Sequence, residues 1–438
     1  MALVQNYHIT GDSAAAIMAS IEQGVRTGNL PPGQSLPPVR RLAQQLGVSP
    51  GTVASAYRSL RQRGIVETAG RAGTVVRSNS PLLAPPMSPL PSGVIDLSHG
   101  EPDTSLLPDL THAISQLPTR AINYHQGGPV PELLELAREV LSRDGVEGSL
   151  TITGGALAAI SLSLTTTLNP GDLVAIEDPG WRNVRDMLAA SGFRTWGIPV
   201  DESGPTANGV AEALAAGARA VIVTNRAQNP TGATISGVRA EELRELLRGH
   251  PDLLLIEDDH WAELSQTPLH HIGNVTGKWV FVRSTSKPCG PDLRVAVVAA
   301  DERTKTFIEG RARLAHGWVS TMLQHLVMSL WRDEEAQRAI EYAGRTYWRR
   351  QMVLRNALRE NGIPALGHSG LNLWVPVDDE AVTVGAMRDR GYAVAPGSLS
   401  RIKTPPGVRI TCSQVEERDV ADIVEAMVSA VRPAGPSV

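Results

Sequence analysis

Apolar residues recur at the spacing of an α-helix in three stretches near the start of the chain. The first covers residues 12–25 and is closed by Gly28, and the second covers residues 39–46, with Gly47 where a C-terminal cap belongs. The third follows Ser49, a good N-terminal capping residue. These stretches predict three helices, the last two joined by a tight turn as in a helix-turn-helix.

The third stretch has Pro50 at the first helical position and ends at Gly64. Residues 65–67 and 74–77, separated by a glycine-containing segment, then predict a hairpin of the kind called a wing. The solvent face of the third helix carries short polar side chains and an arginine, which suit contacts with DNA base edges, and further arginines flank it. The candidate DNA contacts are Arg40, Ser49, Thr52, Ser55, Arg58 and Arg71. A small helical bundle without a role on DNA is the alternative.

The pattern changes after a proline-rich stretch, residues 78–93, into alternating strands and helices. Strands are predicted near residues 151–153, 173–177, 220–224, 253–257 and 279–282, and a helix over 156–168. This alternation predicts an α/β fold with a mostly parallel sheet. From about Arg311, long helical patterns and then strands at 371–375 and 408–411 predict a smaller α/β lobe. The expected domains are 1–77, the linker 78–93, 94–310 and 311–438.

Charge is the part of the composition that changes this picture. Residues 1–80 hold eight arginines, no lysine and three acids, a net of +5, so the remainder of a chain of net charge −4 carries −9. A basic small domain fits a nucleic-acid partner. Two cysteines are too few for a disulfide framework or a thiolate metal site, and we expect no metal. No apolar run reaches the ~18 residues of a membrane span, so we expect a cytoplasmic protein without a membrane partner.

Lys287 is the first candidate for site chemistry, because it follows the predicted strand 279–282 and lies among Ser284, Ser286 and Arg294. Sites in α/β proteins form where such strands end. Three further motifs could supply a carboxylate, a hydroxyl partner and an anion cradle for a pyridoxal phosphate (PLP) bound to this lysine. They are Asn-Pro-Thr-Gly at 229–232, Glu-Asp-Asp-His at 257–260 and Thr-Gly-Gly-Ala at 153–156. A solvated surface lysine is the alternative.

These motifs, in this order, resemble the fold-type I PLP-dependent aminotransferases. The stretches Leu-Pro-Pro-Val-Arg-x-Leu-Ala and Val-Ser-x-Gly-Thr-Val resemble the winged helix-turn-helix of the GntR regulators. Together they resemble the MocR branch of that family. The Asp-Asp-His and Ser-Lys-x-x-Gly-Pro-Asp-Leu-Arg motifs look closest to its PtsJ-type regulators of vitamin B6 metabolism.

The resemblance implies a role for each matched residue. Lys287 would carry the cofactor, Asp258 would meet the pyridine nitrogen, and Asn229 would meet the ring hydroxyl. The implied cofactor-binding set is Lys287, Asp258, Asn229, Arg294, Ser284, Ser286, Trp181, His260, Gly155 and Ala156. Arg409 matches the arginine that binds the substrate carboxylate.

Three positions depart from the family. Pro50 replaces a usual arginine and removes a DNA contact, Ala156 lacks the usual hydroxyl, and His260 replaces a tyrosine. The last two departures weigh against efficient transamination. Because Ala156 lacks the hydroxyl, we expect the phosphate to depend more on Ser284, Ser286 and Arg294.

We therefore expect a homodimeric regulator that binds double-stranded operator DNA and senses PLP or a PLP–amino acid adduct. Its targets would be genes of vitamin B6 or amino-acid metabolism, and the aminotransferase-like domain would be a sensor that retains at most a transamination half-reaction. A PLP-dependent aminotransferase with an N-terminal DNA-binding appendage is the chief alternative. A repressor whose large domain only dimerises is another. The operator, the direction of regulation and the identity of the effector stay open.

Overall fold

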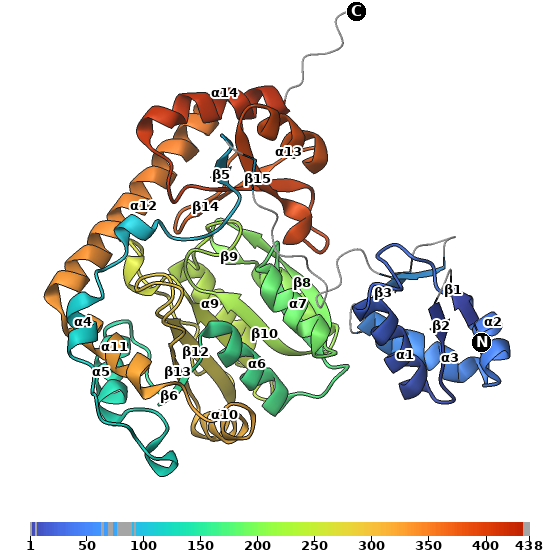
Figure 1. Ribbon diagram of the computed structural model, residues 1–438. Coiled ribbons are helices and arrows are strands. Elements are labelled where there is room, and N and C mark those ends of the chain that lie inside the picture. The colour runs from blue at the N-terminus through green and yellow to red at the C-terminus, as the bar shows by residue number, and fades with distance from the viewer. Residues whose placement is uncertain are drawn as a thin grey trace, which may run out of the picture. The chain divides into compact units, whose positions relative to one another are not determined.

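The structure is a computed structural model that describes residues 2–4, 7–62, 65–68, 73–76, 90–91 and 93–431. Residues 1–89 belong to one compact unit and most of the chain from Leu90 onward to another. Figure 1 labels the elements of both. Among the described residues, no helix is long and apolar enough to cross a membrane.

The N-terminal unit contains the three predicted helices and the wing. Its elements are β1 (Ala2–Val4), β2 (Tyr7–Ile9), α1 (Ala14–Arg26), α2 (Val39–Leu46), α3 (Pro50–Gln62), β3 (Val66–Thr68) and β4 (Thr74–Val76). Helix α2 ends at Gly47, whose φ of 68° is the left-handed conformation that glycine tolerates best. The wing strands β3 and β4 pair antiparallel, with Val66 opposite Val76. The β1–β2 pair was not predicted, because three-residue strands give no measurable periodicity.

One apolar core holds these helices together. Tyr57 of α3 is buried in it, and its hydroxyl donates a 2.7 Å hydrogen bond to the backbone oxygen of Pro37 just before α2. The buried tyrosine therefore ties the second and third helices together, which fixes the outward face of α3. Its core partners include Ile17, Ile21, Leu42, Val53, Leu60 and Val76.

The larger unit is built on an eight-stranded sheet in the order β6-β13-β12-β11-β10-β7-β8-β9. Its strands are β6 (Ser149–Thr153), β7 (Leu173–Asp178), β8 (Arg194–Asp201), β9 (Gly204–Pro205), β10 (Ala218–Thr224), β11 (Leu254–Asp259), β12 (Lys278–Ser284) and β13 (Ala296–Ala300). Strands β10, β11 and β12 run parallel, whereas β13 is antiparallel to β12 and β6. The α/β fold class is confirmed.

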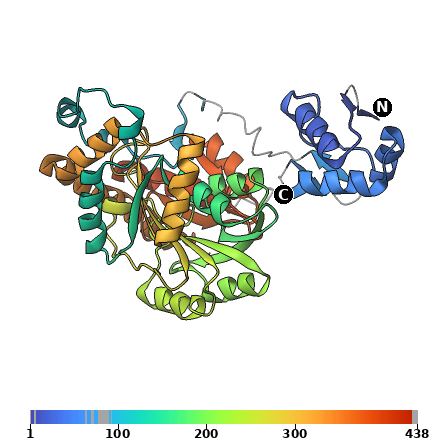
Figure 2. The same cartoon turned by 90° about the horizontal axis from the view of Figure 1, so that it is seen from below.

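Helices pack on this sheet, as Figures 1 and 2 show. They include α5 (Pro131–Arg143), α6 (Ala156–Thr167), α8 (Ala207–Ala215) and α10 (Glu302–Ala315). Helix α9 (Gly237–Leu247) packs on α8, the short α4 (Thr111–Ser115) packs on α11 (Thr321–Arg332), and α7 (Arg182–Ala190) follows β7 along the chain. Helices α6 and α10 pack against each other and against β6, β12 and β13. Strands β8 and β13 were not predicted. The run Ala-Val-Val-Ala-Ala of β13 is apolar throughout, and such a short run does not distinguish a strand from a buried helix.

The C-terminal lobe has its own four-stranded sheet, in the order β14-β16-β15-β5. Its elements are α11 (Thr321–Arg332), α12 (Glu334–Glu360), α13 (Glu380–Asp389), α14 (Val420–Val431), β14 (Asn372–Pro376), β15 (Tyr392–Pro396) and β16 (Gly407–Thr411). Short 3-10 turns are η2 (Thr104–Leu106), η3 (Tyr124–Gln126), η4 (Ala262–Leu264), η5 (Gly397–Leu399) and η6 (Glu417–Asp419).

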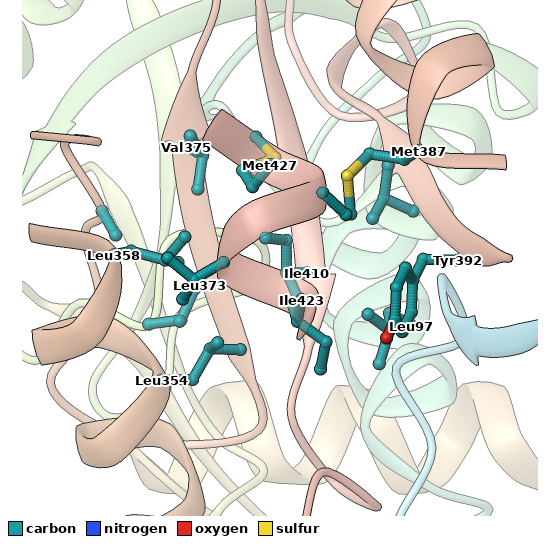
Figure 3. Close-up of a cluster of buried hydrophobic side chains, with 14 of the residues drawn as sticks. Leu97, Leu354, Leu358, Leu373, Val375, Met387, Tyr392, Ile410, Ile423 and Met427 are labelled. Atoms are coloured by element: carbon teal, nitrogen blue, oxygen red, sulfur yellow. The ribbon is translucent and has the colours of Figure 1, made fainter. Parts of the chain in front are cut away.

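The fourth strand of that sheet, β5 (Ile95–Leu97), comes from the start of the unit and pairs parallel with β15. Figure 3 shows Leu97 of β5 in the same apolar cluster as Tyr392, Ile410 and Met427. The segment that follows the proline-rich stretch is therefore part of the C-terminal lobe, and it continues from there toward the edge of the large sheet.

Candidate cofactor site

The candidate cofactor residues gather where the parallel strands of the large sheet end. Thr224 lies opposite Asp258 across β10 and β11, and Asp258 lies opposite Val282 of β12. Ser284, at the end of β12, lies opposite Ala296, which lies opposite Thr153 at the end of β6. One edge of the sheet therefore carries the ends of β6, β10, β11 and β12, which is where α/β folds bind ligands.

Lys287 lies in the turn after β12, and its Nζ donates a hydrogen bond to the backbone oxygen of Gly100. Burial and, to a lesser degree, the charge of Arg409 lower the pKa of Lys287, the charge of Glu101 acts in the opposite direction, and together they bring the pKa to about 8. A lysine with a lowered pKa holds more of its amine in the neutral, nucleophilic form. This lysine therefore has the chemistry that covalent binding of an aldehyde requires.

Asp258 is the next-to-last residue of β11 and a buried acid, 3% exposed. Its Oδ2 lies 3.3 Å from Nδ1 of His260, while its Oδ1 has no hydrogen-bond partner within the described residues. A buried carboxylate oxygen without a donor is costly, so this atom calls for a donor from a ligand. The N–H of a protonated pyridine ring is such a donor, and the residues present fit PLP.

The next acid in the chain, Asp259, is already paired. Its carboxylate lies 2.6 Å from Nη2 of Arg226 and 2.8 Å from Nη2 of Arg283. Burial alone would raise the pKa of Asp259, but the two arginines hold it at about 2. Asp259 is therefore a structural ion-pair partner, and Asp258 is the acid that is available to a ligand.

Arg409 is a partly buried cation on β16 that contacts Asn229. Its Nη1 donates to Oδ1 of Asn229 at 3.0 Å, and its Nη2 donates to the backbone oxygen of Ser98. Burial lowers the pKa of Arg409 and the charge of Asp96 acts in the opposite direction, so that the pKa is about 10. Within the described residues no salt bridge reaches this guanidinium and its Nε has no partner, so a ligand carboxylate could bind there.

The expected phosphate cradle lies at the start of α6. Gly155 has a φ of 97°, and a Cβ built there would lie 2.7 Å from Nη2 of Arg294. That nitrogen donates to the backbone oxygen of Gly154 at 3.2 Å, so the arginine lies over the helix start. Since the N–H of Gly155 donates to the Thr153 oxygen at 2.8 Å, a phosphate would meet N–H groups from Ala156 onward.

Two serines and a tryptophan complete the predicted set. The Ser284 hydroxyl accepts a hydrogen bond from the backbone N–H of Ser286 at 3.3 Å, and the buried hydroxyl of Ser286 has no partner within the described residues. Trp181 follows β7 and is partly buried. No hydrogen bond or ring contact joins it to the other candidates within that same part of the chain.

Several groups at this edge were not predicted from the sequence. Ser98 and Gly100 meet Arg409 and Lys287 through backbone oxygens, which leave no trace in the sequence. Glu177 was predicted as the last residue of the strand 173–177 but not as a site residue; it lies inside β7 and accepts a hydrogen bond from Thr224. Only the order of strands in the sheet brings it close to Asp258.

The predicted DNA contacts lie on α2 and α3. Arg40 and Arg58 are exposed, whereas Thr52 and Ser55 are partly exposed. The Ser49 hydroxyl accepts from the Thr52 backbone N–H at 3.1 Å and lies 2.9 Å from the Thr52 hydroxyl, so it also caps α3. Arg71 lies outside the described residues.

Known protein families match both the N-terminal domain and the larger domain that follows it. Residues 13–76 match the family of bacterial regulatory proteins called gntR, and residues 92–427 match aminotransferase class I and II. The chain is 39% identical to the vitamin B6 salvage pathway transcriptional repressor PtsJ of Salmonella typhimurium, over 96% of this chain and 99% of that protein. It is 27% identical to the pyridoxine biosynthesis transcriptional regulator PdxR of Corynebacterium glutamicum, over 81% and 80%.

A solved kynurenine aminotransferase of Pyrococcus horikoshii shares the fold of the large unit, with a TM-score of 0.71 and 21% identity over 78% of this chain and 91% of that chain. With a gntR domain at its N-terminus and an aminotransferase domain after it, the chain belongs to the MocR branch of the GntR family of bacterial transcription regulators and is related to PtsJ and PdxR.

Proposed function

We propose that this regulator senses PLP and controls genes of vitamin B6 metabolism. The observation that carries the proposal is that one sheet edge holds both Lys287, with its lowered pKa, and the unpartnered buried oxygen of Asp258. An amine and a carboxylate are the groups that the aldehyde and the ring nitrogen of PLP require. The name of PtsJ, a repressor of vitamin B6 salvage, supports the choice of target genes.

When bound, PLP supplies an aldehyde that reacts with amines and a ring that accepts electrons. Lys287 would hold the aldehyde carbon, Asp258 the ring nitrogen, and the Nδ2 of Asn229 the ring hydroxyl. Trp181 and His260 would border the ring. The phosphate would be held by Arg294, Ser284, Ser286, Gly155 and Ala156.

A carboxylate, such as that of an amino acid, is the second ligand that the site supports. Arg409 favours it, because this partly buried guanidinium makes no ion pair within the described residues. Such a ligand could join PLP as a co-effector or undergo a transamination half-reaction. We propose the sensing role, since the domain belongs to a transcription regulator.

The N-terminal domain would bind double-stranded operator DNA with the face of α3. Exposed Arg58 and Arg40 suit phosphate contacts, and Thr52 and Ser55 suit contacts in the major groove. Ser49 and Arg71 complete the proposed set. We expect the arginines to supply most of the affinity and the short polar side chains to contribute specificity.

We also propose that the protein is a homodimer. Several exposed apolar side chains lie in two stretches, residues 114–124 and 314–322, with Tyr124 91% exposed and Leu314 85% exposed. The Tyr124 ring meets Trp318 edge-on at 6.0 Å, so the two stretches are neighbours. Apolar clusters of this kind mark interfaces, and a two-fold dimer would also pair two DNA-binding domains.

Borohydride trapping tests the cofactor proposal. Purified protein with added PLP should gain the absorbance of a lysine-bound PLP, and peptide mapping of the reduced adduct should locate it on Lys287. The Lys287→Ala variant should lose both signals. The control is Lys305→Ala on α10, where the ammonium pairs with Glu309 at 3.2 Å. An adduct on any other lysine would contradict the proposal.

A further inference from the structure

Glu177 is a buried carboxylate at the candidate site with no role in the proposal above. It lies in β7 and is 5% exposed. Its Oε1 accepts from the backbone N–H of Thr224 at 2.9 Å. Its Oε2 accepts from the Thr224 hydroxyl at 2.8 Å and from Nε2 of Gln228 at 3.2 Å. Glu177 therefore joins the ends of two adjacent strands, β7 and β10.

The same contacts hold the turn that carries Asn229. The Nε2 of Gln228 also donates to the backbone oxygen of Pro179 at 2.8 Å. Its Oε1 accepts from the N–H and the hydroxyl of Thr231, at 3.0 and 2.5 Å. The side chain of buried Gln228 therefore links the end of β7 to the far side of the turn, and Asn229 lies between Gln228 and Thr231 along the chain.

The direction of each hydrogen bond around Glu177 and Gln228 is fixed, except at the Thr224 hydroxyl. The N–H groups of Thr224 and Thr231 can only donate, so they fix Glu177 Oε1 and Gln228 Oε1 as acceptors. The amide of Gln228 must then donate to Glu177 Oε2. The Thr231 hydroxyl must donate to Gln228, because an amide oxygen only accepts, so the Thr224 hydroxyl is the group in contact with Glu177 that can either donate or accept. A proton on Glu177 Oε2 is therefore accommodated by rotation of that hydroxyl alone.

The pKa of Glu177 is raised to about 7. Burial is the largest cause, the charge of Asp258 adds to the rise, and the three hydrogen bonds oppose it. The other ionisable groups around it are engaged elsewhere. Asp178 on the same strand accepts from the backbone N–H groups of Ile402, Lys403 and Thr404, and His260 lies against Asp258. The groups that touch Glu177 from β10 and its turn, Thr224 and Gln228, are neutral.

We propose that Glu177 is a positioning residue of the cofactor site that holds the Asn229 turn and gives up a proton when a protonated pyridine ring binds against Asp258. The inference rests on the proposed cofactor function. The ring's positive charge offsets the negative charge of Asp258, so the part of the rise in the Glu177 pKa that comes from Asp258, which adds to the larger effect of burial, is removed. The proton leaves Oε2 for solvent, and the Thr224 hydroxyl turns to donate to the new carboxylate.

Ligand affinity must then rise with pH. The protein with ionised Glu177 binds the ligand more tightly than the protein with protonated Glu177, and a larger fraction is ionised at higher pH. The probe is pyridoxine 5′-phosphate, which has the ring and the phosphate of PLP but no aldehyde. Its binding avoids the reaction at Lys287. The measurement is its dissociation constant by calorimetry between pH 6 and 8.5, expressed as a ratio between variant and wild type so that titration of the ligand cancels.

Glu177→Gln keeps the shape of the side chain but cannot ionise. The ratio by which the wild type binds the ligand more tightly than this variant should therefore grow with pH. One unit of displacement in the Glu177 pKa gives about a tenfold change in the ratio. Thr224→Val removes the hydroxyl that stabilises the ionised form, so its pH step should move to higher pH. Glu212→Gln, at an exposed carboxyl on α8, should follow the wild type.

Identical pH profiles for the wild type and Glu177→Gln, or a Thr224→Val step at lower pH, would overturn the inference while leaving the cofactor proposal intact. If wild-type protein binds no pyridoxine 5′-phosphate and no PLP at any pH, the cofactor proposal fails and this inference fails with it.

Discussion

Adjacent acids at the end of β11 have opposite environments, and the difference identifies the one available to a ligand. Asp259 is bound by Arg226 and Arg283, while Asp258 keeps one buried oxygen without a partner within the described residues. Residue identity alone cannot separate them. A third acid, Glu177, is raised in pKa by burial and by Asp258, so the site holds carboxyls suited to different charge states.

The pKa of Lys287, lowered to about 8, predicts how PLP capture depends on pH. At pH 7 about a tenth of such a lysine is neutral, against less than ~0.1% of a solvated one. Only the neutral amine attacks an aldehyde, so the capture rate should rise with pH and level off above about 8. Stopped-flow absorbance with excess PLP measures it. A rate that is flat from pH 6 to 9 would contradict the assignment.

The charge of Arg409 is one cause of that lowered pKa, so Arg409→Gln should move the inflection to higher pH. Arg313→Gln, on α10, is the control that removes a positive charge away from the lysine. A downward shift in Arg409→Gln would show that Arg409 acts on the lysine in some way other than through its charge.

The sequence predicted the lysine motif, but it could not predict which groups surround the lysine. Lys287 and Asp258 follow apolar strands and keep a recognisable spacing from Ser284 and Arg294. Glu177 has no such signal, because a buried strand that ends in acids resembles the start of a polar turn. Its closeness to Asp258 depends on β7, β10 and β11 being neighbours, which is a property of the sheet.

At the scale of elements, the patterns with several turns of periodicity were predicted well. The three N-terminal helices begin and end within about a turn of their predicted limits, because glycines and Ser49 mark their ends. The alternation of predicted strands and helices in the larger unit correctly predicted its α/β fold class. Strands β5 and β13 were missed, since one has three residues and the other is an uninterrupted apolar run.

Helix α3 carries a specific prediction about DNA affinity. Arg58 is exposed on its outer face, where a phosphate contact releases counterions on binding. Arg58→Gln should weaken binding to all sequences and reduce the salt slope by about one unit. Fluorescence anisotropy over a salt series measures this, with Arg338→Gln on α12 as the control. An unchanged slope, or a loss confined to one base pair, would show that Arg58 does not contact a phosphate.

At the scale of the whole molecule, the exposed apolar cluster predicts a dimer. Leu314→Glu puts a charge in that cluster and should shift the protein toward monomer in sedimentation experiments. Val238→Glu on α9 is the matched control, because Val238 is 74% exposed but lies outside both stretches. If Leu314→Glu stays dimeric while Val238→Glu dissociates, the interface lies elsewhere.

Regulation requires that the ligand and the operator affect each other's binding. A tenfold change in operator affinity needs only ~1.4 kcal/mol of differential ligand binding between two arrangements of the protein. The covalent bond proposed for Lys287 and the charge-assisted contacts proposed for the phosphate would meet that requirement where they form in one arrangement and not in the other. The chain from Gly93 to Gly100 passes through β5 to the backbone oxygens that meet Arg409 and Lys287, so a ligand bound there would act on the segment next to the linker.

The most direct test is operator affinity with and without PLP, measured at fixed salt for the wild type, Lys287→Ala and Arg409→Ala. We predict that PLP changes the wild-type affinity about tenfold or more, as sensing at that coupling energy requires. Lys287→Ala should bind the operator and respond weakly, whereas Arg409→Ala should keep the PLP response and lose any response to amino acids. Equal operator affinity of the wild type with and without PLP, with the cofactor bound, would contradict the sensing function.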